Sequence, residues 1–338
     1  MKIYSKFEAD PELTDWGVSV PLLKSRATQI VEELEKDSNL KGKVKSLESF
    51  MLSKEDLIMA GHQKAFIEDL FSNDDLRIDP HLIETYELIK TDGSYNRFNP
   101  NLKKRRFNDL FLCQLSEASN SYQCAKKVIQ DQEQLFYLSG GMHHAMSFGG
   151  RGFCLINDAI IAIRKLQREN LIKTAWVIDV DVHKGDGTAE MSQGDDSIIT
   201  MSIHMKNGWP LDMEDGPWRI SSNIDIEIED NDNDSYLVKL REGLGKLKNQ
   251  FIRPDFIFIN CGGDPYEHDT LKSSELINLS RAQMLQRNLM LFQFSHDLNI
   301  PTLWTMGGGY GEKSYETYVD FFKEISDQVR EADTFEVV

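Results

Sequence analysis

The sequence predicts a single α/β domain over residues 1–338, with a mostly parallel β-sheet covered by helices on both faces. From residue 135 onward, short apolar runs typical of buried strands alternate with helical stretches, which is the pattern of a parallel sheet. Four of these runs end in glycine-marked loops, and in a parallel sheet those loops would leave the same edge. No linker, internal repeat or low-complexity segment divides the chain.

The amino-terminal third is expected to be mostly helical after a short initial strand. Apolar residues at helical spacing, behind a proline that can begin a helix, indicate the first helix, and a Ser-Lys-Glu-Asp sequence begins the second helical region. Polar residues 72–101 indicate a loop region interrupted by one helix. The predicted elements are a strand at residues 2–4 and helices at Pro21–Lys36, Ser53–Leu70, His81–Lys90 and Lys103–Gln130.

The rest of the chain supplies most of the expected sheet. Its strand-like runs are Leu135–Leu138, Ala175–Val180, Ser197–Ile203, Ile224–Ile228, Phe256–Ile259 and Thr302–Met306. Its helical stretches are Leu155–Glu169, Ser235–Gln250, Ser280–Leu298 and Ser314–Glu331.

Composition excludes several classes of protein. The net charge of −17 argues against general affinity for nucleic acid or anionic membranes and is compatible with cationic substrates. The four cysteines form no Cys-x-x-Cys pair, so neither a zinc knuckle nor a disulfide framework is indicated. The first ten residues lack the apolar core of a signal peptide and no apolar run could span a membrane, so a cytoplasmic location is expected.

The segment from Trp176 to Gly187 carries the strongest functional signal. Asp179, Asp181 and His183 follow a buried strand at alternate positions, so in extended backbone they would project to one side. Carboxylates beside an imidazole at a buried strand end are costly unless their charge is compensated. A divalent metal is the simplest compensation, and oxygen and nitrogen donors suit zinc.

The other three glycine-marked loops would bring further polar side chains to the same edge. The loop after Leu138 holds a His-His pair, the loop after Asn260 holds an aspartate, and the loop after Met306 holds a tyrosine. These residues are His143, His144, Asp264 and Tyr310.

The collected side chains suit metal-assisted hydrolysis of an amide. Asp181, His183 and Asp264 would bind one zinc ion and leave a position open. Either histidine of the pair can act as general base or acid near neutral pH. The remaining carboxylates, Asp179 and Asp186, suit the role of fixing their tautomers, and Tyr310 can donate its hydroxyl to a developing oxyanion.

The other histidines singled out, and Lys184, are not predicted to take part in the site. His62 is interpreted as a packed or capping histidine, and Lys184 as solvated or structural. His204, His268 and His296 are not expected to be ligands, although His268 follows Asp264 closely. Phosphate binding by the glycine-rich loops is disfavoured because no P-loop lysine or Gly-x-Gly-x-x-Gly follows a strand.

Four motifs, in order from about residue 135 to residue 311, resemble those of the histone deacetylase family, within the arginase/deacetylase superfamily. They are the segment Gly140–Ala145 with its His-His pair, the segment Gly152–Ala159, the Asp-x-Asp-x-His motif in Asp179–Gly187, and Gly263–Asp264 with Gly308–Tyr310. The resemblance implies one α/β domain with a parallel sheet of about eight strands and a zinc pocket at its carboxyl edge.

The resemblance also implies roles for individual residues. The zinc ligands would be Asp181, His183 and Asp264, with His143 paired to Asp179 and His144 to Asp186. Gly152, Phe153 and Trp209 would line a narrow channel for an acylated alkyl-amine. A monovalent cation, usually potassium in relatives, would lie at Asp179, Asp181, His183 and Ser202.

Departures from the family pattern leave the substrate open. Lys184 stands where many relatives have a second histidine, the sequence after Asp264 differs from that of the best-known eukaryotic enzymes, and the common early His-Pro-Glu segment is absent. Relatives act on acetyl-lysine in proteins, on acetylated polyamines or on other small acyl amides. A binuclear manganese ureohydrolase like arginase and an inactive binding module are the other two classes considered, and no oligomeric state is predicted.

Overall fold

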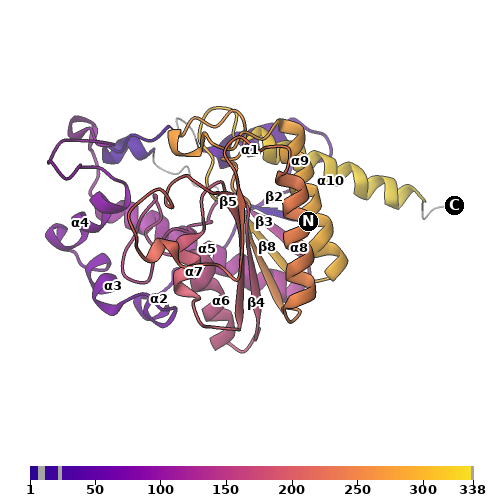
Figure 1. Cartoon of the computed structure of the whole chain (residues 1–338), viewed down its shortest axis with the longest axis horizontal. Coiled ribbons are helices and arrows are strands. Elements are labelled where there is room, and N and C mark those ends of the chain that lie inside the picture. The colour runs from indigo at the N-terminus through magenta and orange to yellow at the C-terminus, as the bar shows by residue number, and fades with distance from the viewer. Residues whose placement is uncertain (7–11, 22–24, 336–338) are drawn as a thin grey trace.

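The computed structural model describes residues 1–6, 12–21 and 25–335 and has a β-sheet at its centre (Figure 1). Eight strands, each parallel to its neighbours, lie in the order β2-β1-β3-β8-β7-β4-β5-β6. The strands are β1 Lys2–Tyr4, β2 Val44–Lys45, β3 Gln134–Tyr137, β4 Ala175–Asp179, β5 Ile198–Met205, β6 Ile224–Ile228, β7 Phe256–Asn260 and β8 Thr302–Thr305. The parallel sheet predicted from the sequence is therefore confirmed.

Helices cover both faces of the sheet (Figure 1). One face is covered by α2 Lys54–Met59, α3 Lys64–Leu70, α4 Asp75–Thr85, α5 Phe107–Asp131, α6 Asp158–Arg168 and α7 Asp186–Met191. The other is covered by α1 Arg26–Leu34, α8 Tyr236–Gln250, α9 Arg281–Leu298 and α10 Glu316–Phe335. None of the helices that the structure describes is long and apolar enough to cross a membrane.

Strands β4, β5, β7 and β8 are buried along their whole length and are largely apolar, because both of their faces are covered. In β3, Leu135 and Tyr137 belong to the core formed with α5 and α6, whereas Phe136 belongs to the opposite core. Phe136 stacks on Trp304 of β8, with ring centroids 6.1 Å apart. The two cores hold the sheet between the helical layers and fix the positions at which its strands end.

Three predictions in the amino-terminal third were wrong in detail. The helix predicted at His81–Lys90 is α4, which begins at Asp75 because the Asp74 side chain accepts a hydrogen bond from the Leu76 N–H, and which ends before Glu87 with its left-handed φ of 51°. The helical region predicted at Ser53–Leu70 is two helices, α2 and α3, separated by residues 60–63.

The first predicted helix also starts later than expected. It begins at Arg26, where the Ser25 side chain accepts a hydrogen bond from Thr28, and not at Pro21. Part of the predicted range, residues 22–24, lies outside the described residues. The two-residue strand β2 was not located by any sequence pattern, although the family resemblance implied about eight strands.

Candidate metal centre

The four glycine-marked loops meet because the strands that precede them are neighbours. β3, β8, β7 and β4 lie side by side in the sheet, and all point the same way. The loops contact one another through their backbones: Gly307 N–H donates to Gly140 O over 3.1 Å, and Gly263 N–H donates to Gly308 O over 2.7 Å. This convergence at the carboxyl edge was predicted from topology and is confirmed.

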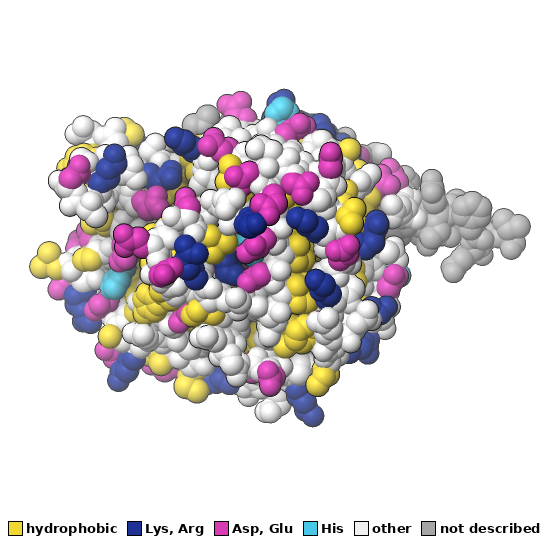
Figure 2. All heavy atoms as spheres, in the orientation of Figure 1, with side chains coloured by type: hydrophobic (Ala, Val, Ile, Leu, Met, Phe, Trp, Pro, Cys, Tyr) yellow, Lys and Arg dark blue, Asp and Glu magenta, His cyan; other side chains and the backbone are white. Residues whose placement is uncertain are grey.

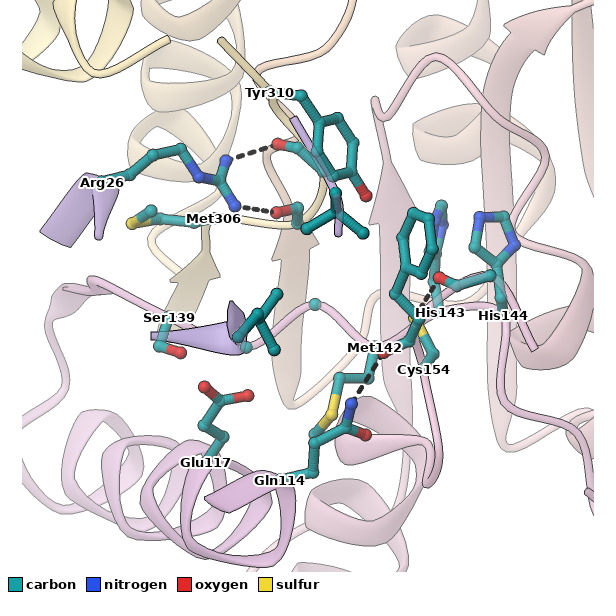
Figure 3. Close-up of a pocket in the computed structure, with 18 of the residues that line it drawn as sticks. Arg26, Gln114, Glu117, Ser139, Met142, His143, His144, Cys154, Met306 and Tyr310 are labelled. Atoms are coloured by element: carbon teal, nitrogen blue, oxygen red, sulfur yellow. Dashed lines mark hydrogen bonds between the residues drawn. The ribbon is translucent and has the colours of Figure 1, made fainter. Parts of the chain in front are cut away.

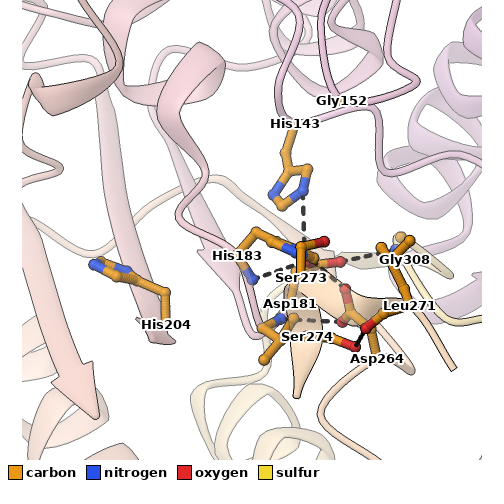
Figure 4. Close-up of polar contacts among 12 residues, drawn as sticks. His143, Gly152, Asp181, His183, His204, Asp264, Leu271, Ser273, Ser274 and Gly308 are labelled. Carbon is orange, nitrogen blue, oxygen red and sulfur yellow. Dashed lines mark hydrogen bonds and ion pairs between the residues drawn. The ribbon is translucent and has the colours of Figure 1, made fainter. Parts of the chain in front are cut away.

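Asp181, His183 and Asp264 form a buried cluster at this edge (Figure 4). His183 Nδ1 lies 3.1 Å from Asp181 Oδ1 and 3.1 Å from Asp264 Oδ2. The three residues each offer one ligand atom, and these atoms lie within 4.8 Å of one another. β4 ends at Asp179, so Asp181 and His183 lie in the loop beyond the strand rather than on one face of it.

Backbone groups hold the two carboxylates of this cluster in place. Asp181 Oδ2 accepts a hydrogen bond from Gly308 N–H over 2.8 Å, and Asp264 Oδ1 accepts one from Val182 N–H over 3.0 Å. Each carboxylate therefore has one oxygen fixed and the other at His183. Two buried carboxylates and one imidazole fit a divalent cation, since without one their charges are costly to bury.

The electrostatics of the cluster agree with this fit. Burial alone would lower the pKa of His183, but its hydrogen bonds to Asp181 and Asp264 raise it to about 10. Burial, with the neighbouring charge of Asp181, raises the pKa of Asp264 to about 7. The raised pKa values of His183 and Asp264 mean that the cluster favours added positive charge, as a cation site would.

Each histidine of the pair contacts its own buried carboxylate. His143 Nδ1 lies 2.6 Å from Asp179 Oδ2, and His144 Nδ1 lies 2.6 Å from Asp186 Oδ1. Both contacts leave the Nε2 atoms free of these carboxylates. His143 Nε2 lies 3.6 Å from Asp181 Oδ1, so the pair borders the cluster directly.

The pKa values of the two histidines move in opposite directions. Burial lowers that of His143, but the charges of Asp179 and Asp181 outweigh it and raise the pKa to about 9. Burial lowers the pKa of His144 well below its usual range, and the positive charges of His143 and His183 lower it further. These surroundings favour the protonated form of His143 and the neutral form of His144.

The residues expected to line a channel surround a cavity of about 440 Å³ outside the cluster. The Trp209 ring lies edge-on to His144 with centroids 4.6 Å apart, and the Phe153 ring lies edge-on to Tyr310 at 5.9 Å. Gly152 must be a glycine for these contacts, because a Cβ there would lie 2.5 Å from Trp209 and 2.6 Å from His144. The structure thus brings Gly152, Phe153 and Trp209 together.

A second cavity, of about 280 Å³, extends inward from the cluster (Figure 3). Figure 3 shows Tyr310 across this cavity from His143 and His144. The Arg26 guanidinium donates to Gly307 O and Gly308 O, both over 2.6 Å, and thereby anchors the loop that carries Tyr310. Sequence reasoning missed Arg26 because it lies in an ordinary helix 281 positions from its partner.

The residues of the expected monovalent-cation site are also buried. Asp179 and Ser202 are paired across β4 and β5, and Ser202 Oγ lies 2.9 Å from His204 Nδ1. Figure 4 shows His204 apart from the Asp181–His183–Asp264 cluster. Lys184 is buried, and its ammonium lies 2.7 Å from Asp225 Oδ2, so the structural reading of this lysine is correct.

The remaining histidines do not join the cluster. His62 is packed as predicted: its Nδ1 lies 3.1 Å from Met146 O, and its Nε2 accepts a hydrogen bond from Asn157 N–H over 3.2 Å. His268 contacts Lys313, and His296 lies beside Asp297 on α9.

Fold and site together define an α/β protein with a candidate metal centre at the carboxyl edge of a parallel sheet. A family model described as the histone deacetylase domain matches residues 20–324, and the chain belongs to this family.

Individual relatives agree with this assignment. The chain is 31% identical over 179 residues to an uncharacterised protein of Picosynechococcus, covering 53% of this chain and 56% of that protein. It is 27% identical over 289 residues to the probable histone deacetylase 1-A of Xenopus laevis, covering 81% and 58%. The chain spans about half the length of the curated relatives that it matches.

Solved structures confirm the fold. An HDAC homologue from Aquifex aeolicus matches with a TM-score of 0.70 and 19% identity, covering 96% of this chain and 84% of that one. An HDAC homologue complexed with SAHA matches with a TM-score of 0.70 and 21% identity over the same shares.

Proposed function

We propose that the chain is a zinc-dependent amidohydrolase that removes acetyl or other acyl groups from acyl-lysine side chains of proteins. The observation that carries the proposal is the buried cluster of Asp181, His183 and Asp264 bordered by two histidine–carboxylate pairs. Such an arrangement supplies metal ligands, a base and an acid within one pocket.

Asp181, His183 and Asp264 would hold the zinc ion. When bound, zinc acidifies a water molecule and polarises an amide carbonyl. Asp181 and Asp264 are fixed by the backbone hydrogen bonds from Gly308 and Val182, which orients their free oxygens before any ion binds. A potassium ion beside Asp179, Asp181, His183 and Ser202 is part of the same proposal.

The two histidines would divide the proton transfers between them. Neutral His144 takes a proton from the attacking water as general base, while protonated His143 supplies positive charge and a proton for the leaving amine. Asp186 and Asp179 hold the two imidazoles through their Nδ1 atoms. Tyr310 keeps its proton, because burial raises the pKa of its hydroxyl well above the usual value, and so can donate to the oxyanion.

The outer cavity suits the alkyl stem of an acyl-lysine. Phe153, Trp209 and Tyr310 supply aromatic walls, and Gly152 leaves room between them. Relatives named histone deacetylase and a neighbour complexed with SAHA support an acylated substrate. Acetylated polyamines are the alternative, because an acyl group on any linear amine would meet the same walls.

Metal analysis combined with a substrate panel tests the proposal. The purified chain should hold one zinc and hydrolyse acetyl-lysine peptides faster than acetylated polyamines. Asp264→Ala should lose both zinc and activity, whereas Asp297→Ala, an exposed aspartate of α9, should keep both. Longer acyl-lysine peptides would define the acyl preference.

Other outcomes identify the alternatives. Two manganese ions per chain with hydrolysis of arginine would indicate a ureohydrolase, for which His143, His144 and Asp181 form a second possible ligand group. Bound zinc without turnover of any acyl amide would indicate a binding module.

A further inference from the structure

Asp186 is a buried carboxylate, and His144 contacts only one of its two oxygens. Its Oδ1 contacts His144, but its Oδ2 is buried and has no hydrogen-bond partner among the described residues. The nearest cation is Arg151, whose guanidinium lies 3.2 Å from Oδ2 as an ion pair. A buried carboxylate without a compensating charge is strongly disfavoured, and Arg151 supplies such a charge at Asp186 Oδ2.

The carboxylate on the His143 side has neutral partners for its second oxygen. Asp179 Oδ1 accepts hydrogen bonds from Asp181 N–H and from Asn260 Nδ2, at 3.1 and 3.0 Å. Neutral donors therefore satisfy Asp179 Oδ1, whereas Asp186 Oδ2 faces a cationic side chain, Arg151, from the loop between Ser147 and Cys154.

The Arg151 guanidinium is also enclosed by two aromatic rings. It lies 5.0 Å from the centroid of the Trp209 ring and 4.7 Å from that of Trp218. Both distances are typical of a cation–π contact. A further amino group of Arg151 lies 3.1 Å from the sulfur of Met213. Three side chains of the rim loop, residues 206–220, thus contact the Arg151 guanidinium.

Trp209 connects this rim loop to the metal centre. Its ring lies edge-on to His144 at 4.6 Å and edge-on to His183 at 5.6 Å. The Arg151 guanidinium lies over the same Trp209 ring. One side chain therefore contacts both the partner of His144 and the channel wall that covers His144.

We propose that Arg151 is a positioning residue that aligns the His144–Asp186 pair and the Trp209 channel wall together. The inference rests on the proposed function, since it assigns Arg151 a part in both turnover and substrate binding. A change at Arg151 should alter kcat through Asp186 and KM through Trp209.

Two substitutions separate these effects. Arg151→Met keeps the aliphatic stem but removes the charge and the planar group, so kcat should fall roughly 10- to 100-fold, as for other residues that orient a ligand or base, and KM should rise. Arg151→Lys keeps a charge near Asp186 but cannot hold two rings with a planar fork. It should recover most of kcat while KM stays raised.

Arg219→Met is the matched control. Arg219 belongs to the same rim loop, donates to Leu211 O and Met213 O, and forms an ion pair with Asp215 rather than with Asp186. Both constants should stay close to those of the parent. Chemical rescue adds a readout for a chain that is folded but inactive: methylguanidinium should restore kcat to Arg151→Ala.

The outcomes separate the two levels of inference. A parent chain that hydrolyses no acyl amide rejects the proposed function. An active parent with unchanged kcat and KM in Arg151→Met rejects only the role of Arg151. Equal losses in Arg151→Met and Arg219→Met also overturn it, since they would indicate a general loosening of the rim loop.

Discussion

The two sides of the metal centre use the same pair of residues in opposite electrostatic settings. On one side, His143 meets Asp179 at the end of β4, with Asp181 close by. On the other side, His144 meets Asp186 at the start of α7, with a guanidinium behind the carboxylate. The charges of Asp179 and Asp181 raise the pKa of His143, whereas burial and the nearby positive charges lower that of His144. In the proposed mechanism the first histidine is therefore the acid and the second the base. Two adjacent histidines, each paired with a carboxylate, thus differ in pKa because the charges near each pair differ.

Removing each histidine in turn tests this difference most directly. His144→Ala should lower kcat by about 10³–10⁴, near the upper end for loss of a general base, because the neutral imidazole has gone. His143→Ala should cost less, about 10²-fold, since water can protonate a leaving amine. Stopped assays on an acetyl-lysine peptide, with zinc content measured in parallel, check both values. Equal losses would mean that the two sides are equivalent, and loss of zinc from either folded variant would contradict the ligand set.

Tyr310→Phe tests the hydroxyl that lies across the cavity from both histidines. It removes a hydroxyl donor but keeps the ring that packs on Phe153, so kcat should fall by roughly 10²–10³ with little change in KM. Zinc content and melting temperature should match the parent. The ratio between the His143 and His144 effects should persist in the Tyr310→Phe background. A variant with most of its kcat would exclude the hydroxyl as an oxyanion donor.

His62 shows how a buried histidine behaves away from the cluster. Burial lowers the pKa of His62 to about 4, and its two nitrogens contact backbone groups. In the unfolded chain His62 has a pKa near 6.5, so between pH 6.5 and pH 4 it binds a proton that it does not bind in the folded chain. Stability should therefore be full above pH 6.5 and fall as the pH drops toward 4, by up to ~3 kcal/mol.

His62→Gln isolates this contribution. The amide can donate to Met146 O and accept from Asn157 N–H but cannot titrate. Urea unfolding at pH 7 and pH 4.5 should show a smaller loss of stability in the variant than in the parent. His204, whose pKa burial also lowers to about 4, should keep part of the acid sensitivity. The same pH dependence in both proteins would show that His62 is not the titrating group.

Substrate charge should have the smallest effect, because the charges on both sides of the centre are buried. The net charge of −17 favours cationic substrates by long-range attraction. Raising the salt concentration should lower kcat/KM a few-fold more for a lysine-rich peptide than for a neutral one. On the face seen in Figure 2, however, acidic and basic side chains are interspersed. Equal salt sensitivity would place the excess acidic charge away from the mouth.

The sequence predicted the parts of the site that depend on the order of strands. Parallel strands place their ends together whatever the loops do, so Asp181, His183 and Asp264 could be grouped without coordinates. Arg26 and Arg151 could not be found in this way. Their partners are set by where a helix packs and how the rim loop folds, and nothing in the local sequence encodes either.

The errors in the predicted elements occur where the local sequence pattern is weak or misleading. α4 was misplaced because Asp74 acts as a helix cap in a stretch whose composition is typical of loops. β2 consists of two residues, too few to show a period of two. Long apolar strands such as β4 were located to within a residue or so because burial on both faces leaves a continuous signal.

The contact between the loops at Gly141 and Gly307 has a consequence for altering this protein. A Cβ at Gly141 would lie 2.6 Å from Gly307 N and would also collide with Asn260 Oδ1. Neither loop can gain a side chain there unless the other retreats, and retreat would carry Tyr310 away from the histidines. A library built to change substrate preference should therefore keep these glycines fixed and vary the rim loop only at positions other than Trp209, Met213 and Trp218, which contact His144 or Arg151.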